Sequence, residues 1–269
     1  MDDQTPPPAP PAERLRAWVR ATALAREGAR LGLRAAVDVL YPPGCVACGR
    51  ALAQAHALCP PCWRAAPWIE RPYCERLGAP FPVDMGPGAI SLAAAGDPPV
   101  FARARAAMRH DAVGRELAHR LKYGDRMDLA PMMGRWMARA GRELLADGPV
   151  IAPVPLHWTR LWRRRMNQAG ALAAAVAQES GAELAPDALE RRRRTRSQVG
   201  LTRNERAENL QGAFAVTEAG KLAIKGRRVL LVDDVYTTGS TANAASRALL
   251  RGGAEAVDVL TFARVCLPA

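Results

Sequence analysis

Apolar positions along this chain follow two different periods. Short runs of valine, isoleucine and leucine at 149–155 and 229–232 are typical of strands buried inside a sheet, and prolines close the first run. Other stretches show helical spacing or resemble shorter strands. The expected helices are 112–122, 129–145 and 161–179, and further strands are expected near Ala188, near Phe214 and at 255–262. This alternation predicts an α/β fold, in which helices cover both faces of a parallel sheet.

The segment Val229–Ser246, which reads VLLVDDVYTTGSTANAAS, carries the densest chemistry. Its period changes after Gly239 from that of a strand to that of a helix, so the intervening loop lies where open α/β sheets bind ligands. Backbone N–H groups and hydroxyls at a helix N-terminus favour a phosphate, and a glycine lets the backbone approach it closely. The candidate phosphate ligands are Thr237, Thr238, Gly239, Ser240 and Thr241.

Two carboxylates, Asp233 and Asp234, precede this loop. They would repel a phosphate placed directly against them, so sugar hydroxyls or a divalent cation such as Mg²⁺ are the expected partners. A ribose phosphate with Mg²⁺ meets all these demands. The alternative is that two acids before a threonine- and glycine-rich turn merely cap a helix.

The same run resembles the phosphoribosyl pyrophosphate (PRPP) signature of type I phosphoribosyltransferases. In that family paired acids hold the ribose hydroxyls and the following loop cradles the 5′-phosphate. The resemblance implies a type I phosphoribosyltransferase fold, with Asp233 and Asp234 as the catalytic pair and PRPP as the ligand.

Four cysteines form two Cys-x-x-Cys pairs near the start of the chain: Cys45, Cys48, Cys59 and Cys62. Two such pairs supply four thiolates to one tetrahedral Zn²⁺, which leaves no open position and makes the zinc structural. Disulfides are the alternative, and a thioredoxin-like redox role is weaker, because neither pair opens a helix after a strand.

The cysteine pairs and the downstream motifs together resemble the ComF family of competence proteins, in which a double zinc-ribbon-like segment precedes a phosphoribosyltransferase domain. The second ribbon of that family often begins with another Cys-x-x-Cys-Gly. Here the stretch is Cys74-Glu-Arg-Leu77-Gly78, which argues against a second zinc site and leaves Cys74 and Cys266 as free thiols.

The resemblance extends to the loop after the first predicted strand, where PVPLH and a later Asn-Gln match the family pattern. It implies that His157, Arg160 and Arg164 contact the diphosphate, although Arg165 and Met166 stand where the family has glycine and an aromatic residue. The alternative for the arginines is a solvated helix face.

A basic stretch from Arg191 to Arg206 matches the family pattern R-x-x-x-T-x-x-Q-x-x-L. It corresponds to the mobile loop that closes over the diphosphate in type I enzymes, which makes Arg191 and Arg196 candidate ligands. Guanidinium groups suit this task because they remain charged and donate to phosphate oxygens in a fixed fork. The arginine run is equally suited to a nucleic-acid patch.

Composition adds a charge constraint to this picture. The 269 residues include 38 Lys+Arg against 26 Asp+Glu, and the net charge of +12 favours polyanionic partners such as nucleotides, diphosphates or nucleic acid. No apolar stretch approaches the roughly 20 residues that span a bilayer, and the acidic, proline-rich start is not a secretory signal. We therefore expect a cytoplasmic protein without a membrane span.

The expected organisation has four parts, which are a disordered tail at 1–12, a helical segment at 13–40, a zinc-ribbon-like module with a degenerate second half at 41–80, and a phosphoribosyltransferase-like domain at 100–269. Two functions remain open. One is a Mg²⁺-dependent enzyme that transfers ribose 5-phosphate from PRPP to an unknown acceptor, linked to DNA uptake in natural transformation. The other is a non-catalytic protein that binds single-stranded DNA and proteins of the DNA-uptake machinery, with Trp63, Trp68 and Tyr73 as candidate stacking platforms. Core packing is the alternative use for at least two of these three side chains.

Overall fold

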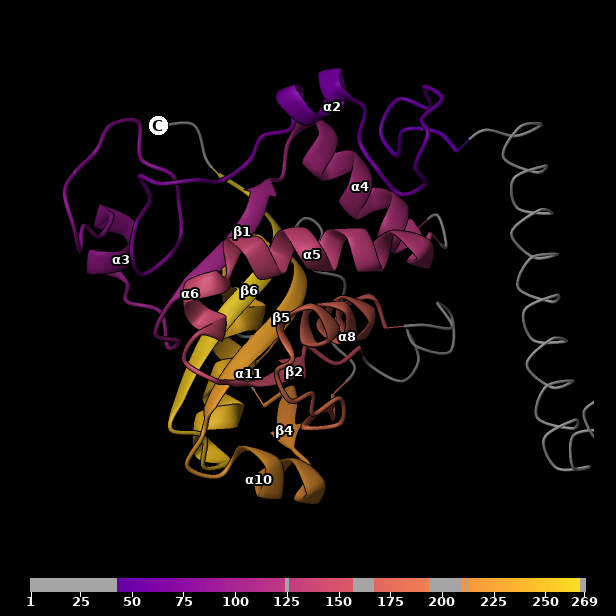
Figure 1. The fold of residues 1–269 in the computed structure, drawn as a ribbon. Coiled ribbons are helices and arrows are strands. Elements are labelled where there is room, and N and C mark those ends of the chain that lie inside the picture. The colour runs from indigo at the N-terminus through magenta and orange to yellow at the C-terminus, as the bar shows by residue number, and fades with distance from the viewer. Residues whose placement is uncertain (1–42, 124–125, 157–166, 194–209, 211, 267–269) are drawn as a thin grey trace, which may run out of the picture. The chain divides into compact units, whose positions relative to one another are not determined.

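The computed structural model describes residues 43–123, 126–156, 167–193, 210 and 212–266 (Figure 1). The chain divides into two compact units, residues 1–57 and 58–269. The tail predicted at 1–12 and the helical segment predicted at 13–40 lie outside the described residues.

A four-stranded parallel sheet forms the centre of the second unit, with strand order β1-β6-β5-β2. The strands are β1 (Ala104–Arg109), β2 (Val150–Pro153), β5 (Arg228–Tyr236) and β6 (Ala256–Arg264). β5 is a central strand, since Val150 of β2 pairs with Val229 and Ala256 of β6 pairs with Arg228. The predicted parallel sheet is confirmed, and the two predicted strands at 149–155 and 229–232 are direct neighbours within it.

Helices pack on both faces of this sheet. Figure 1 shows α5 (Ala130–Ala140) and α8 (Gln168–Ser180) in front of the strands and α11 (Ser240–Arg251) behind them. Residues Val229–Val232 of β5 have no exposed surface, as expected for a strand covered on both sides. The remaining helices in the described part of this unit are α2 (Pro60–Ala65), α3 (Leu92–Gly96), α4 (Ala112–Tyr123), the short 3₁₀ turn η1 (Met127–Leu129), α6 (Arg142–Leu145) and α10 (Glu218–Ile224).

One predicted helix is wrong in its extent. The expected helix at 129–145 is divided into α5 and α6 at Gly141, which caps α5 with φ of −94° and ψ of 14°. A Cβ at position 141 would lie 2.9 Å from Cδ1 of Leu260 in β6, so the chain passes too close to the sheet here for a side chain. The helices predicted at 112–122 and 161–179 appear as α4 and α8, although 161–166 lie outside the described residues.

Strands were expected near Ala188 and Phe214, and they are present with a different partnership. β3 (Leu189–Arg191) and β4 (Phe214–Val216) pair with one another in an antiparallel two-stranded sheet apart from the parallel one. Each of these strands has only three residues, so its sequence pattern is too short to indicate its partner strand.

Strand β1 was not predicted, because its sequence ARAAMR lacks a run of β-branched residues. It pairs with β6 on one side, and the segment that precedes it in the chain covers the other edge. Within β1, the backbone N–H of Arg109 donates to Pro67 O (2.8 Å), and that of Ala104 donates to Arg76 O (2.9 Å). In the opposite direction, the N–H of Ile69 donates to Ala107 O (3.1 Å). This cover satisfies polar groups that an open sheet edge would leave available for aggregation.

None of the helices in the described part of the chain is long and apolar enough to cross a membrane.

We expect Gly134→Ala to destabilise the protein although alanine favours helices by about 1 kcal/mol. A Cβ at 134 in α5 would overlap the Cβ of Ala175 in α8, and overpacking costs typically 1–3 kcal/mol. Gly170→Ala in α8 is the matched control, since its Cβ would meet Asn167 at an ordinary 3.5 Å. Urea unfolding should give opposite signs for the two changes. A stabilising Gly134→Ala would contradict this close helix packing.

Candidate functional site

The two acids predicted to bind a ligand lie where β5 approaches its carboxyl end. Both are partly buried, and each carboxylate accepts a hydrogen bond from the following amide, Asp233 from Asp234 N (2.9 Å) and Asp234 from Val235 N (2.7 Å). They remain within the strand, which runs four residues further than the predicted apolar core 229–232. Because β5 is central, its carboxyl end lies in the middle of the sheet edge.

The two carboxylates form an electrostatically strained pair. Burial and the adjacent charge of Asp234 raise the pKa of Asp233 to about 8. Lys122 of α4 places its Nζ 3.7 Å from Asp234 and relieves the repulsion in part. Burial and the charge of Arg115 lower the pKa of His110, so this neighbour of Asp234 adds little positive charge at neutral pH. A bound cation, or a ligand rich in hydroxyl donors, would stabilise the ionised pair.

The loop after β5 makes a tight turn into α11. Gly239 is the N-cap residue with φ of +80°, in the left-handed region, and a Cβ there would overlap the hydroxyl of Tyr236. The hydroxyls of Thr238 and Ser240 lie 2.9 Å apart, and Thr237 is exposed. The first amides of α11 follow directly, and a helix N-terminus offers such amides and its positive dipole end to an anion.

A small pocket lies between Asp233 and this loop. Several of the predicted ligands line it together with apolar residues of β5, β6 and α11 and with Val154, which follows β2. Its lining is Val154, Leu231, Asp233, Val235, Tyr236, Thr237, Gly239, Thr241, Ala242, Val259 and Thr261. The pocket thus brings the carboxyl group of Asp233 together with Thr237, Gly239 and Thr241 of the hydroxyl-rich loop.

Arg191 is the one diphosphate candidate among the described residues. It lies in β3 with its guanidinium 5.3 Å from the centre of the Phe214 ring, and it is not among the residues that line the pocket. His157, Arg160, Arg164 and Arg196 lie outside the described residues. The predicted role of all five in diphosphate binding stays a prediction.

Three residues of the site were missed by the sequence analysis. Lys122 reaches Asp234 from a separate helix, Tyr236 supports the turn beneath Gly239, and Thr261 of β6 pairs in register with Asp233. Tyr236 packs between Phe101, at 6.1 Å between ring centres, and the Arg264 guanidinium, at 4.3 Å. Only Tyr236, which lies between the acids and the loop, carried a sequence signal.

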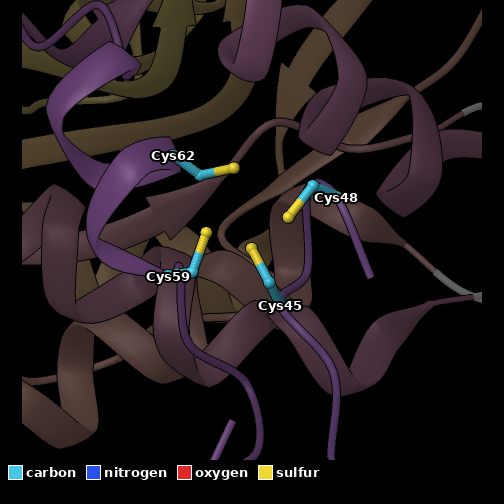
Figure 2. A group of neighbouring side chains, drawn as sticks. All are labelled: Cys45, Cys48, Cys59 and Cys62. Atoms are coloured by element: carbon cyan, nitrogen blue, oxygen red, sulfur yellow. The ribbon is translucent and has the colours of Figure 1, made fainter. Parts of the chain in front are cut away.

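The four predicted zinc ligands come together. Cys45, Cys48, Cys59 and Cys62 have sulfur atoms that all lie within 4.8 Å of one another, and Figure 2 shows the four side chains converging. A tetrahedral Zn²⁺ with bonds of about 2.3 Å separates its sulfur ligands by roughly 3.8 Å, so the cluster fits this ion. No disulfide joins any of the six cysteines of the chain, all of which are described.

Two known domain families match this chain, one over the four cysteines and one over the acidic pair and its loop. A double zinc ribbon domain matches residues 36–91, and a phosphoribosyl transferase domain matches residues 167–265. The second match contains the acidic pair, the 237–241 loop and α11.

Individual relatives are similar over different shares of the chain. The DNA utilization protein YhgH of Escherichia coli (strain K12) is 31% identical over 234 residues, which cover 84% of this chain and 99% of YhgH. Competence protein F of Haemophilus influenzae is 40% identical over 114 residues, 42% of this chain and 49% of that protein. A solved structure of the glutamine PRPP amidotransferase of B. subtilis, complexed with ADP and GMP, has 18% identity and a TM-score of 0.37, and the match covers 53% of this chain and 30% of the amidotransferase.

The raised pKa of Asp233 predicts a pH-dependent stability. The folded protein holds this proton up to about pH 8, while an unfolded chain releases it near 3.8, so the folded state loses stability as pH rises between these values. Asp233→Asn should therefore stabilise the protein relative to wild type by an amount that grows by roughly 1–3 kcal/mol from pH 5 to 8.

Chemical denaturation at several pH values measures this difference. Glu218→Gln is the control, because this glutamate lies on the surface with an 88% exposed side chain, and its effect should not change with pH over this range. A constant difference between wild type and Asp233→Asn would mean that the carboxyl is already ionised at pH 5.

Proposed function

This chain belongs to the ComF family, together with YhgH and competence protein F, and on that premise we propose that it binds PRPP with Mg²⁺ and transfers ribose 5-phosphate to an acceptor. The observation that carries the proposal is the pocket in which Asp233, the first acid of the pair, lies beside Thr237, Gly239 and Thr241 at the start of α11. We further propose a division into a zinc module at 41–80 and a phosphoribosyltransferase-like domain at 100–269.

Each group of the pocket has a defined task in this proposal. The helix start at Ser240 and the hydroxyls of the 237–241 loop bind the 5′-phosphate, because amides and a positive dipole end converge there. Asp233 and Asp234 accept hydrogen bonds from the ribose hydroxyls and stabilise positive charge at C1. Lys122 holds Asp234 in place. Asp233 and Asp234 would hold Mg²⁺, which would supply positive charge to the diphosphate leaving group.

Positioning and electrostatics account for the proposed reaction without a covalent intermediate on the protein. The bond from C1 of the ribose to the diphosphate oxygen breaks, the diphosphate leaves with the bonding electrons, and the acceptor's lone pair forms the new bond to C1. The proton that the acceptor carried is lost to a base or to water. Arginines from 157–168 and 191–206 are the proposed partners of the departing diphosphate.

The names of the relatives concern DNA utilization and competence, and we propose a role linked to DNA uptake for this chain. The four-cysteine cluster is proposed to hold a structural zinc, since its four thiols leave no position for a substrate.

Calorimetric titration with PRPP and Mg²⁺ tests the proposed ligand. We expect wild type to bind, and Asp233→Asn/Asp234→Asn to lose at least tenfold in affinity, because each amide lacks the negative charge and one of the two oxygen acceptors that a carboxylate offers to Mg²⁺ and the ribose. Glu218→Gln/Glu255→Gln makes the corresponding acid-to-amide change at two exposed positions and should bind like wild type. Absence of binding by wild type, or equal binding by the acidic-pair variant, would rule out the PRPP site.

A second function, binding of single-stranded DNA, is supported by the arginine run 191–194 and the net charge of +12. The aromatic candidates are less favourable. Trp63 is 40% exposed but packs against Trp68 with ring centres 4.6 Å apart, and Tyr73 lies between the guanidinium groups of Arg71 and Arg105. These contacts leave little ring surface for stacking bases.

Salt dependence separates this second function from the first. If the arginine run contacts DNA phosphates, replacing Arg192, Arg193 and Arg194 with glutamine should reduce the slope of log K against log salt by about 2, at 0.7 per contact. Replacing the exposed Arg139, Arg142 and Arg251 is the control and should leave the slope unchanged. Equal slopes for the two variants would argue against a DNA-binding role for the run.

A further inference from the structure

Residues 72–96, here the second ribbon, repeat the backbone of residues 43–65, the first ribbon. In each, a leading cysteine donates its N–H to the carbonyl five residues later, at 2.7 Å for Cys45 and 2.8 Å for Cys74. Each cysteine carbonyl also accepts from the glycine four residues later, at 2.9 Å and 2.7 Å respectively. The two knuckle turns therefore have the same hydrogen bonds.

The match continues beyond the turn. The two knuckle glycines, Gly49 and Gly78, both have positive φ, +76° and +63°. The residue after each leading cysteine, Val46 or Glu75, donates to an alanine carbonyl across the ribbon, at 3.0 Å and 2.9 Å. An antiparallel bridge flanks each turn, Gly44 with Ala51 in the first ribbon and Tyr73 with Pro80 in the second.

Both ribbons also end in the same way, with a short helix. Cys59 is the N-cap of α2 with φ of −67° and ψ of 157°, and Ser91 is the N-cap of α3 with φ of −74° and ψ of 155°. In each case the amide four residues later donates back to the N-cap carbonyl, at 2.8 Å and 3.0 Å. The two N-cap residues thus occupy equivalent positions.

This equivalence assigns a counterpart to every zinc ligand of the first ribbon. Cys45, Cys48, Cys59 and Cys62 correspond in order to Cys74, Leu77, Ser91 and Ala94. Leucine and alanine have no metal-binding atom, and a serine hydroxyl is a poor ligand for Zn²⁺ compared with a thiolate. The second half of the double zinc ribbon, a match that runs to residue 91, therefore does not fit a metal in this chain.

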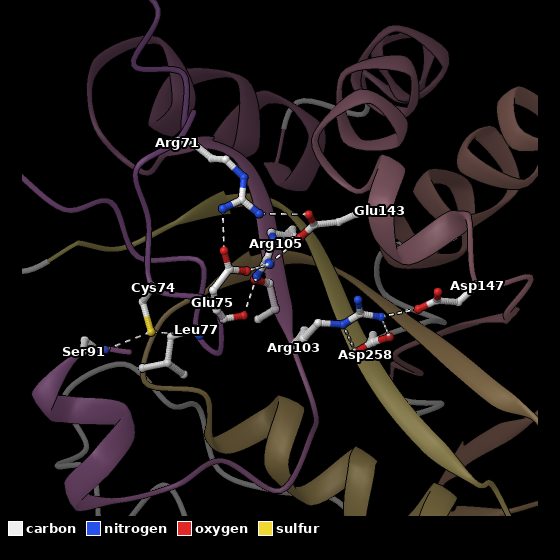
Figure 3. Close-up of polar contacts among 11 residues, drawn as sticks. Arg71, Cys74, Glu75, Leu77, Ser91, Arg103, Arg105, Glu143, Asp147 and Asp258 are labelled. Atoms are coloured by element: carbon white, nitrogen blue, oxygen red, sulfur yellow. Dashed lines mark hydrogen bonds and ion pairs between the residues drawn. The ribbon is translucent and has the colours of Figure 1, made fainter. Parts of the chain in front are cut away.

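Apolar packing stabilises the second ribbon at the positions where the first ribbon has its metal ligands. Cys74, Leu77 and Ala94 are 0%, 9% and 3% exposed and belong to the same apolar core as strands β2, β5 and β6. The sulfur of Cys74 accepts hydrogen bonds from the amides of Ser91 (3.2 Å) and Leu77 (3.4 Å), as Figure 3 shows. The sulfur of Cys74 thus links the knuckle turn to the start of α3, and Leu77 and Ala94 lie in the same apolar core.

An ion-pair network anchors the second ribbon to the sheet. Arg105 of β1, which is 3% exposed, donates to Glu75 Oε2 (2.8 Å) and pairs with Glu143 of α6, and Arg71 pairs with both acids (Figure 3). Gly78 lies so close to β1 that a Cβ would overlap the carbonyl oxygen of Ala104. In contrast, α2 of the first ribbon has no buried residue. A segment with so little apolar burial needs a metal to order it, and the second ribbon does not.

We infer that the second ribbon is a zinc ribbon that folds without metal, in which Cys74, Leu77, Ser91 and Ala94 replace the four ligands and burial against the sheet replaces the ion. Its backbone keeps the ligand geometry, so thiols restored at the three changed positions recreate a tetrahedral zinc site. This inference does not depend on PRPP binding.

Metal analysis of purified, zinc-loaded full-length protein tests it. Wild type should carry one zinc per chain, Cys74→Ala should carry the same amount, and Cys59→Ser/Cys62→Ser should lose it. Leu77→Cys/Ser91→Cys/Ala94→Cys should gain one further zinc per chain. The matched control adds Cys74→Ala to this triple variant, which leaves three thiols and should abolish the gain.

The outcomes separate the two ribbons. Two zinc ions in wild type, or loss of zinc in Cys74→Ala, would overturn the metal-free second ribbon. No added zinc in a folded triple variant, checked by circular dichroism, would overturn the preserved geometry. If wild type held no zinc while the triple variant held one, the inference would stand and the zinc proposed for the first ribbon would fall.

Discussion

The pairing of β5 between two parallel partners is the constraint on which the rest of the structure depends. Its backbone is bonded on both sides, and Val229–Val232 are fully buried, so its carboxyl end is the place where polar side chains can meet a ligand. The acids at 233 and 234, the turn at Gly239 and the start of α11 follow within a few residues. A shift in register would move all of them together.

That placement has an energetic cost, because burial and the neighbouring charge of Asp234 both oppose ionisation of Asp233. The fold tolerates this through local bonds, since each carboxylate accepts the next amide and Lys122 approaches Asp234. A pair held in this state gains stability from any cation or hydroxyl-rich ligand it binds. Ligand-binding sites commonly contain ionisable groups whose burial or mutual repulsion is unfavourable until the ligand binds and offsets it.

The two ribbons, residues 43–65 and 72–96, share one backbone conformation that is stabilised in two different ways. The first ribbon has four converging thiols and little apolar burial, whereas the second shares the core of the parallel sheet and is tied to β1 through Arg105. The second ribbon also continues the chain that covers the outer edge of β1. Its loss of metal ligands therefore accompanies a structural role in the larger unit.

The sequence by itself determined the parallel sheet, the two buried strands at 150 and 229, the acid-loop-helix segment and the four-cysteine cluster, because each is encoded by contiguous residues or fixed spacing. That the two strands are direct neighbours came from the tertiary structure. It missed β1 and the break at Gly141, where contact with β6 outweighs local propensity. It marked Leu77 as a departure but gave no sign that Ser91 and Ala94 complete the same four positions. Contacts such as Lys122 with Asp234 and Arg105 with Glu75 join residues distant in the chain, so only the tertiary structure could decide them.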